Sequence, residues 1–289
     1  MQALTPQLKV SQSHIYATNS GLFVDDGAAC LIDPGITPAE IAALAAQLEE
    51  EALDPRALIL THGHWDHLLG PEHFPGVKVV AHAAYLKVLD QHGEDLQRQI
   101  AQWEAQMEIR RERPFILPRP DFAFSSTLQI TVGQTALELH HAPGHAPDAL
   151  VIYHPESGLL WAGDMLSDVE IPYVSDDLTA YEETLAYLAK LDVRALVPGH
   201  GNPTTERTEI KRRLRADRTY LTELRSRVAA VVALGYSLEE TLTACAEISI
   251  HHPEINAGPH RLNVESVYVA LGGEADPAQV GWSQEWTET

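Results

Sequence analysis

Potential metal ligands are densely packed between residues 61 and 67, where the chain reads Thr-His-Gly-His-Trp-Asp-His. His62, His64, Asp66 and His67 all carry side chains that bind divalent metal ions. Each of three further candidates downstream directly follows a glycine: His145, Asp164 and His200. Together these seven residues predict a site that holds two divalent ions side by side.

The residue types suit hydrolysis assisted by metal ions. Neutral imidazole and carboxylate groups are good ligands for first-row metals, and a catalytic zinc typically keeps one position open for water. Two ions about 3.5–4 Å apart can share a hydroxide, polarise a substrate oxygen and stabilise a leaving group. A carboxylate has two oxygens and can bridge such a pair, which makes Asp164 the natural bridging candidate.

The order of these motifs resembles that of the metallo-β-lactamase-fold hydrolases, over roughly residues 8–205. The resemblance implies one metal bound by His62, His64 and His145, and a second bound by Asp66, His67 and His200, with Asp164 bridging the two. Asp33, in the sequence Leu31-Ile32-Asp33-Pro34-Gly35, matches the early aspartate that supports the ligands from behind. The implied fold is a four-layer αβ/βα sandwich of two mixed β-sheets.

Elements that alternate between strand and helix must position these ligands, so we expect an α/β fold. Residues 8–35 alternate apolar and polar positions, and 19–21 and 25–27 are turn signals. Thr37, Pro38 and Glu40 predict the start of a helix that runs to about Leu53. The buried strand 57–60 then leads directly into the metal motif.

The middle of the chain predicts further strands at 77–81, 127–132, 135–141, 149–154 and 159–162, a helix at 178–191 and a short strand at 195–197. Residues 83–113 are charged and helical in pattern, and the prolines in 114–120 predict an extended connector. We interpret 83–122 as a helical insertion in a catalytic domain of residues 1–205. It could serve as a lid or pocket wall, or equally as a packing helix or oligomer contact.

Residues 206–289 are expected to form a helical C-terminal appendage. Leucines and valines recur at helical spacing from 206 to 234 and predict one long helix. Ser237 and Glu240 form a capping-box pattern that opens a second helix. A third helix is expected from His260 to Leu271, stopped by two glycines.

Composition narrows the function classes. The net charge of −21 argues against general binding of nucleic acid. No apolar run approaches the roughly 20 residues of a membrane span, and residues 1–6 lack the pattern of a signal peptide. Cys30 and Cys245 are isolated in the sequence, which favours buried thiols in a reducing cytoplasm over a disulfide.

Residues that contact the substrate are harder to predict from the sequence than residues that bind the metal ions. Tyr173 follows the bridging aspartate closely, and Tyr220 is a second tyrosine that could reach a substrate oxygen. Eight of the 20 basic residues lie between 207 and 227, and Arg215 and Arg218 among them are candidates for binding a small anionic substrate. The other interpretation of this basic stripe is a solvated helix face paired with Glu209, Asp217 and Glu223.

The function these observations favour is that of a binuclear metal-dependent hydrolase, in which a metal-bridging hydroxide attacks an ester, thioester or lactone carbonyl. Asp66 and Asp164 are the expected catalytic carboxylates, and the glyoxalase II-like branch of the family is the nearest in pattern. Zinc is the expected metal, with manganese or iron as alternatives. The alternative functions are a phosphodiesterase or single-strand endoribonuclease, a mononuclear iron persulfide dioxygenase, and a non-catalytic binding module.

Overall fold

The first half of the chain forms a seven-stranded mixed sheet. In this computed structural model, which describes residues 1–112 and 114–274, the strands lie in the order β1 to β7. Neighbours from β1 to β4 are antiparallel, and those from β4 to β7 are parallel. The strands are β1 (Gln2–Ala3), β2 (Leu8–Gln12), β3 (Asn19–Asp25), β4 (Ala28–Ile32), β5 (Asp54–Ile59), β6 (Lys78–His82) and β7 (Phe122–Phe124).

The second sheet has five strands in the order β12-β11-β10-β9-β8. It is antiparallel except for the pair β11 and β12, which are parallel because α3 (Leu178–Leu188) connects them. The strands are β8 (Thr127–Val132), β9 (Thr135–His141), β10 (Leu150–His154), β11 (Leu159–Trp161) and β12 (Ala195–Val197).

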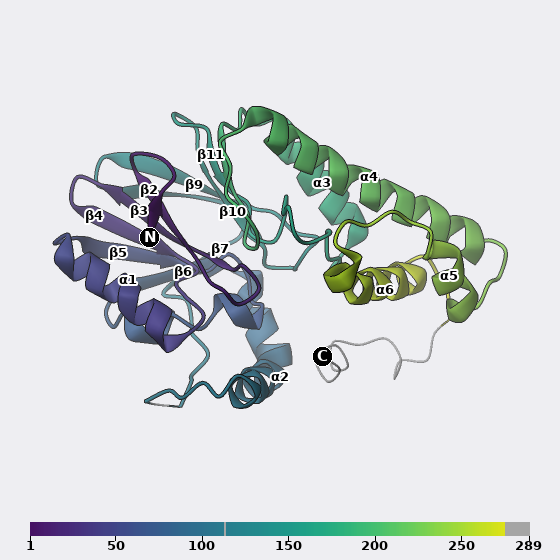
Figure 1. Cartoon of the computed structure of the whole chain (residues 1–289), viewed down its shortest axis with the longest axis horizontal. Helices are drawn as coiled ribbons and strands as arrows, with labels where there is room; N and C mark the ends of the chain where they lie inside the picture. Colours follow the sequence, from purple (N-terminus) through teal and green to yellow (C-terminus); the bar gives the residue numbers. More distant parts are fainter. Residues whose placement is uncertain (113, 275–289) are drawn as a thin grey trace.

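Alternation along the strands divides the interior into layers. On β4, Cys30 and Ile32 pack between the two sheets, whereas Ala29 and Leu31 point to the opposite face, where α1 (Pro38–Glu50) and α2 (Ala84–Gln106) cover them. The outer face of the second sheet packs against α3 and the C-terminal helices. The predicted four-layer sandwich of two mixed sheets is therefore confirmed (Figure 1).

The start of α1 follows from its predicted caps. The Thr37 hydroxyl accepts from the Glu40 backbone N–H, and the Glu40 carboxylate accepts from the Thr37 N–H, with Pro38 in the first turn. Ile41, Leu44 and Leu48 then recur at helical spacing and pack on the first sheet. The capping box, whose hydrogen bonds lie within four residues, therefore defines where α1 begins.

Helix α2 ends seven residues earlier than the predicted limit at 113. Glu108 adopts a left-handed backbone with φ of 54°, and the chain folds back so that Arg111 pairs with Glu104. The helix contributes Tyr85, Leu96 and other apolar side chains to the core cluster it shares with α1. Residues 83–122 therefore include a packing helix, and the first turns of α2 also line a cavity beside His64.

Asn19-Ser20-Gly21 is not the turn that the sequence predicted, because it begins strand β3. The Asn19 side chain is fully buried and donates to the carbonyls of Pro198 and Gly201. A Cβ on Gly21 would come within 2.6 Å of the Trp161 ring, so glycine is needed for the two sheets to approach. The second signal is a true turn, in which Asp26 and Gly27 both have positive φ.

The C-terminal region consists of α4 (Arg207–Val232), α5 (Leu238–Cys245) and α6 (Pro253–Ala270). The capping box of Ser237 and Glu240 is present. Helix α6 begins seven residues before the predicted start, since Pro259 does not interrupt it. Gly258 precedes that proline and has no Cβ to collide with the pyrrolidine ring. The remainder of the predicted appendage, residues 275–289, lies outside the described residues.

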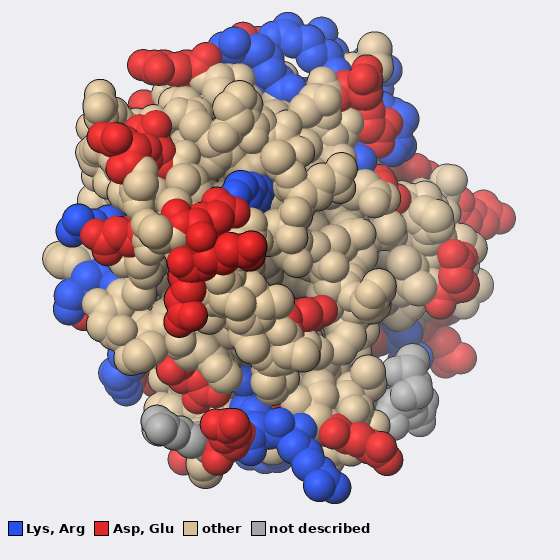
Figure 2. Space-filling model, turned by 60° about the vertical axis from the view of Figure 1, so that its left-hand side comes forward, with Lys and Arg blue, Asp and Glu red and all other residues tan. Residues whose placement is uncertain are grey.

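These helices share one hydrophobic cluster with α3 and the second sheet, including Tyr181, Leu221 and Val264. The predicted domain boundary at residue 205 remains a prediction. Acidic side chains form a cluster near the middle of the face in Figure 2, beside one basic group, and further acidic and basic side chains lie along its edges. No helix within residues 1–112 and 114–274 is long and apolar enough to cross a membrane.

Candidate metal centre

The metal motif lies on the loop after β5, at the carboxyl end of a parallel strand. Residues Trp65–His67 form a single 3₁₀ turn, η1, which brings Asp66 and His67 onto the same side as His62. Trp65 packs against Trp103 of α2 with ring centroids 4.7 Å apart, so the core holds this turn in place. The neighbouring strand β4 ends just before Asp33, whose carboxylate accepts from the Thr61 backbone N–H at 2.8 Å.

Three histidines and Asp164 form the first ligand group. His145 Nε2 lies 3.3 Å from His62 Nε2 and 3.0 Å from His64 Nδ1. Asp164 Oδ2 lies 3.3 Å from His62 Nε2 and 3.4 Å from His145 Nε2. Ligand atoms around a tetrahedral ion with bonds of about 2.1 Å lie about 3.4 Å apart, so these separations suit one ion.

The second ligand group comprises Asp66, His67 and His200, all buried. His200 Nε2 lies 3.1 Å from Asp66 Oδ2, and His67 Nε2 lies 3.7 Å from the same oxygen. Asp164 connects the two groups: its Oδ1 is 3.2 Å from His67 Nε2, while its Oδ2 is 3.4 Å from His200 Nε2 as well as near the first group. The structure thus brings together all seven residues that the sequence singled out.

Hydrogen bonds behind the site fix which nitrogen each histidine presents. His145 Nδ1 bonds the Tyr173 carbonyl at 3.0 Å, and His200 Nδ1 bonds the Tyr16 carbonyl at 2.9 Å. A carbonyl only accepts, so in both rings Nδ1 carries a proton and Nε2 is the nitrogen left to bind a metal ion. His67 Nδ1 is directed in the same way at Asp33 Oδ2, 3.0 Å away. Asp33 thus lies behind the ligands, where the family resemblance places the early aspartate.

The side chains of the two ligand groups are suited to binding metal cations. His67 Nε2 and Asp164 Oδ1 are both buried and have no hydrogen-bond partner, although they lie only 3.2 Å apart. Buried polar atoms without a partner are rare because leaving them unsatisfied is costly. Imidazole nitrogens and carboxylate oxygens that converge in this way are an arrangement that a metal ion satisfies when it displaces the protons of the histidines. Either ligand group could hold one ion.

The two ligand groups differ in their affinity for protons. Burial lowers the pKa of His62 to about 4 and holds that of His64 well below its ordinary value. Burial would also lower the pKa of His67, but Asp164, Asp66 and Asp33 together hold it well above the usual range. Burial likewise opposes protonation of His200, and Glu170 and Asp164 outweigh it. The second group therefore carries protons that a metal ion would have to displace.

A close backbone approach confines Asp164. A Cβ on Gly199 would lie 1.9 Å from Asp164 Oδ1, so only glycine can precede His200 without moving the carboxylate. The Gly199 N–H also donates to the Gly163 carbonyl at 2.6 Å, which connects the loops carrying the two ligands. The small residues next to Asp164 and His200 are thus part of the site.

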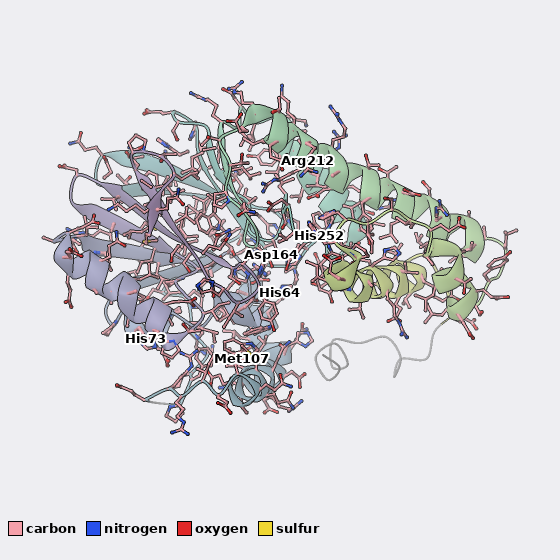
Figure 3. The ribbon with its side chains drawn as sticks, viewed as in Figure 1. His64, His73, Met107, Asp164, Arg212 and His252 are labelled. Atoms are coloured by element: carbon pink, nitrogen blue, oxygen red, sulfur yellow. The ribbon has the colours of Figure 1, made fainter. Side chains whose placement is uncertain are left out.

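Tyr173 is the predicted substrate contact that the structure places at the site. Its ring centroid is 6.4 Å from that of His64 and 6.0 Å from that of His145. Figure 3 shows His64 and Asp164 where the sheets meet the C-terminal helices. A cavity of about 240 Å³ adjoins His64, and its lining includes Lys87 and Gln91 from α2 and also Ser175.

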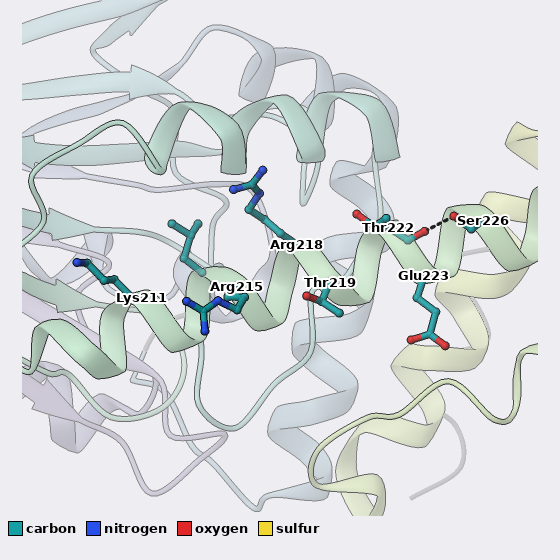
Figure 4. A pocket seen from close by; sticks show the side chains of 8 residues that line it. Lys211, Arg215, Arg218, Thr219, Thr222, Glu223 and Ser226 are labelled. Atoms are coloured by element: carbon teal, nitrogen blue, oxygen red, sulfur yellow. Dashed lines mark hydrogen bonds between the residues drawn. The ribbon is translucent and has the colours of Figure 1, made fainter.

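Tyr220, Arg215 and Arg218 are not placed as the sequence predicted. Tyr220 is 6% exposed, and its hydroxyl bonds His260 and Asn263 within the helical region. Arg215 and Arg218 line a separate groove of about 600 Å³ on α4, whose lining includes none of the seven ligand candidates (Figure 4). The helix turns its other face inward, so these side chains point away from the buried residues Arg213 and Asp217.

Several residues at the site were not predicted from the sequence. Glu170 Oε1 approaches His200 Nδ1 to 3.7 Å, and Ser175 Oγ lies 3.4 Å from His64 Nε2. Both belong to the segment between Asp164 and α3, which has no periodic pattern. Their only sequence signal was proximity to Tyr173 and Asp164.

Comparison with known proteins agrees with this geometry. Residues 15–200 match the family model described as the metallo-beta-lactamase superfamily. The chain is 28% identical over 164 residues to an acyl-coenzyme A thioesterase, MBLAC2, of Gallus gallus, covering 51% of this chain and 57% of the relative. It is 30% identical over 183 residues to a hydroxyacylglutathione hydrolase of Anaeromyxobacter dehalogenans, covering 62% and 59%. The chain thus spans less than two thirds of the length of these curated relatives.

Among solved structures, the sec-alkylsulfatase Pisa1 of Pseudomonas sp. superposes with a TM-score of 0.75 at 20% identity, covering 96% of this chain and 51% of that one. The BLEG-1 B3 metallo-beta-lactamase superposes with a TM-score of 0.56 at 24% identity and covers 73% of this chain and 97% of its own. These likenesses show the shared fold. The family match contains all seven ligand candidates, and the last of them, His200, is its final residue. The chain therefore belongs to the metallo-β-lactamase superfamily.

Proposed function

We propose that this protein is a binuclear metal-dependent hydrolase that cleaves an ester, thioester or lactone bond. The observation that carries the proposal is the position of Asp164, whose two oxygens lie within 3.4 Å of nitrogens from both ligand groups. One carboxylate shared in this way, with unpaired acceptors around it, suits two neighbouring cations better than one.

His62, His64 and His145 would hold one ion, Asp66, His67 and His200 the other, and Asp164 both. Zinc is the proposed metal, and a set of imidazoles and carboxylates also accepts manganese or iron. When bound, two such ions supply an activated water near neutral pH and electrostatic stabilisation of the developing charge. We propose a reducing compartment for this chemistry, because Cys30 and Cys245 are both buried free thiols.

Asp66 is proposed to orient the attacking water as well as to bind metal. Burial would raise the pKa of its carboxyl, but His67 and His200 hold the pKa well below the ordinary value. The group is therefore an ionised acceptor at neutral pH, and it is 8% exposed. The Tyr173 ring and the cavity beside His64 are proposed to receive the acyl substrate.

The acyl class is supported by two relatives, which are named as a thioesterase and as a hydroxyacylglutathione hydrolase. A second candidate is hydrolysis of an alkyl sulfate ester. The chain is 25% identical over 128 residues to a linear primary-alkylsulfatase, covering 42% of this chain and 24% of that protein. The acyl proposal ranks first because the acyl-acting relatives match longer parts of the chain in sequence, whereas the likeness to Pisa1, at 20% identity, shows the fold alone.

The test is a panel of hydrolysis assays on protein whose metal content has been measured. The substrates are an acyl-glutathione and an acyl-coenzyme A thioester, a lactone, an aryl ester, a primary alkyl sulfate, a phosphodiester and short single-stranded RNA. Dominant turnover of an acyl substrate that disappears in Asp66→Ala supports the proposal. Dominant cleavage of sulfate or phosphate esters would reject the acyl class, and a protein with one iron ion per chain that consumes oxygen would reject hydrolysis.

A further inference from the structure

Helix α6 presents two buried asparagines to the segment that borders the metal centre. Asn256 and Asn263 are seven residues apart, so they lie on one face of the helix about two turns from each other. Their exposed fractions are 1% and 0%. Both side chains bond to the backbone of residues 169–174, and each makes one further bond, Asn256 to the His251 carbonyl and Asn263 to the Tyr220 hydroxyl.

Asn263 holds the peptide groups on either side of Tyr173. Its Oδ1 accepts from the Val174 N–H at 2.7 Å, and its Nδ2 donates to the Pro172 carbonyl at 2.7 Å. The Tyr173 carbonyl between these contacts is the acceptor for His145 Nδ1. Asn263 and the ligand candidate His145 therefore bond to the same peptide group, Asn263 to its N–H and His145 to its carbonyl.

The orientation of the Asn263 amide is itself fixed. His260 Nε2 lies 3.1 Å from the Cys245 carbonyl and must donate to it, so His260 Nδ1 accepts from the Tyr220 hydroxyl at 2.9 Å. The Tyr220 oxygen then accepts from Asn263 Nδ2, also at 2.9 Å. This directional chain from α5 through α4 leaves Asn263 only one way to face Tyr173.

Asn256 bonds in the same way to the peptide groups on either side of Glu170. Its Oδ1 accepts from the Ile171 N–H at 3.2 Å and its Nδ2 donates to the Val169 carbonyl at 2.9 Å. The residue it encloses is Glu170, which faces His200 and not His145. The two asparagines therefore act on residues next to different ligand groups.

We propose that Asn263 is a positioning residue for the first ligand group: it fixes the Tyr173 carbonyl, which sets the ring orientation and tautomer of His145. This inference rests on the proposed metal centre. Partners that orient a histidine ligand typically contribute 10–100-fold to metal affinity. The C-terminal helices would then be required for a complete site as well as for packing.

The experiment measures zinc affinity by competition with a chelating indicator, in two single-site backgrounds. His200→Ala leaves the group that contains His145, and His64→Ala leaves the other group. Asn263→Ala is expected to weaken zinc binding about tenfold or more in the first background and less than about twofold in the second. Asn256→Ala, a matched change on the same helix, is expected to leave the first background within about twofold.

Val264→Ala on the same helix controls for loss of packing, since Val264 is fully buried and carries no hydrogen bond to the segment. Equal weakening by Asn263→Ala and Val264→Ala, or no weakening by Asn263→Ala, overturns the inference. If Asn263→Ala does not fold, Tyr220→Phe removes only the hydroxyl that orients the amide. Unchanged affinity in that variant likewise overturns the inference, and weaker affinity in the first background alone supports it. Wild-type protein that binds no zinc would instead reject the proposed metal centre itself.

Discussion

His67 Nε2 and Asp164 Oδ1 face each other across 3.2 Å in the protein interior, and neither atom has a hydrogen-bond partner. The Nδ1 atom of His67 is directed at Asp33, so the ring cannot turn to relieve this contact without losing another. A proton on His67 can satisfy the pair, and a metal ion can replace that proton. The relationship makes Asp164 the residue on which occupancy of both sites should depend.

Replacing Asp164 with alanine is expected to lower the bound zinc from two ions per chain to one or fewer. Hydrolytic activity should fall by more than about 100-fold, because loss of mere outer partners of a ligand already costs 10–100-fold. Elemental analysis and initial rates on the best acyl substrate measure both effects. Two tightly bound ions and near wild-type rates in Asp164→Ala would contradict the bridging role.

Zinc binding near pH 7 is expected to release about two protons per chain. Those protons come from His67 and His200, whose pKa values nearby carboxylates hold well above the ordinary value despite burial. Affinity for the second ion should therefore rise as pH rises. Calorimetric titration in two buffers with different ionisation enthalpies counts the protons, and His200→Ala, which removes the second ligand group, should lower the count by about two. Heats that do not depend on the buffer would refute the prediction.

Gly199→Ala is expected to reduce activity and to destabilise the protein by about 1–3 kcal/mol, the usual cost of overpacking. The new Cβ would lie 1.9 Å from Asp164 Oδ1, so the carboxylate or the loop must move. Gly93→Ala within α2 is the matched control, since its Cβ would meet nothing nearer than Leu117 Cδ1 at 3.4 Å. That substitution should be neutral or stabilising by up to about 1 kcal/mol. Urea denaturation compares the two, and equal behaviour would contradict the steric argument.

The sequence predicted the features that depend on local signals. Capping boxes at Thr37 and Ser237 define helix starts by hydrogen bonds within four residues, and strands such as β12 follow from short apolar runs. The seven ligand candidates were found because a dense cluster of histidine and aspartate has few structural uses. Their convergence depends on the packing of the two sheets, because the loop after β5 belongs to the first sheet and the loops after β9, β11 and β12 belong to the second.

Features that depend on tertiary contact could not be predicted. Asn19 has the same sequence signature as a turn asparagine, and only the position of the Pro198 loop shows that its amide is buried. Helical periodicity shows that Arg215 and Arg218 share a face of α4, but it does not tell which face lies near the metal centre. Asn263 and Asn256 carry no spacing signal at all, since two asparagines in a helix are more often solvent-exposed.

Asp217, which is not one of the ligand candidates, is expected to make the free energy of unfolding depend on pH. Its carboxylate is 2% exposed and accepts the Leu166 N–H at 2.9 Å, and burial raises its pKa to about 7. Between about pH 4 and 7 the unfolded chain loses this proton while the folded chain retains it. The free energy of unfolding therefore falls as pH rises through this window, and the loss is complete above about pH 7.

Asp217→Asn keeps an acceptor for the Leu166 N–H and removes the charge, so the variant should gain stability relative to wild type as pH rises from 5 to 8. The pKa change from 3.8 to about 7 spans about three units, of which about two lie above pH 5, so the expected gain between pH 5 and pH 8 is roughly 3 kcal/mol at most. Urea denaturation of metal-free protein at both pH values measures the difference, and His titrations cancel between the two chains. Asp90→Asn, the same change at an exposed position of α2, controls for the loss of one charge. An equal gain at pH 5 and pH 8 would show that burial of the Asp217 charge does not limit stability.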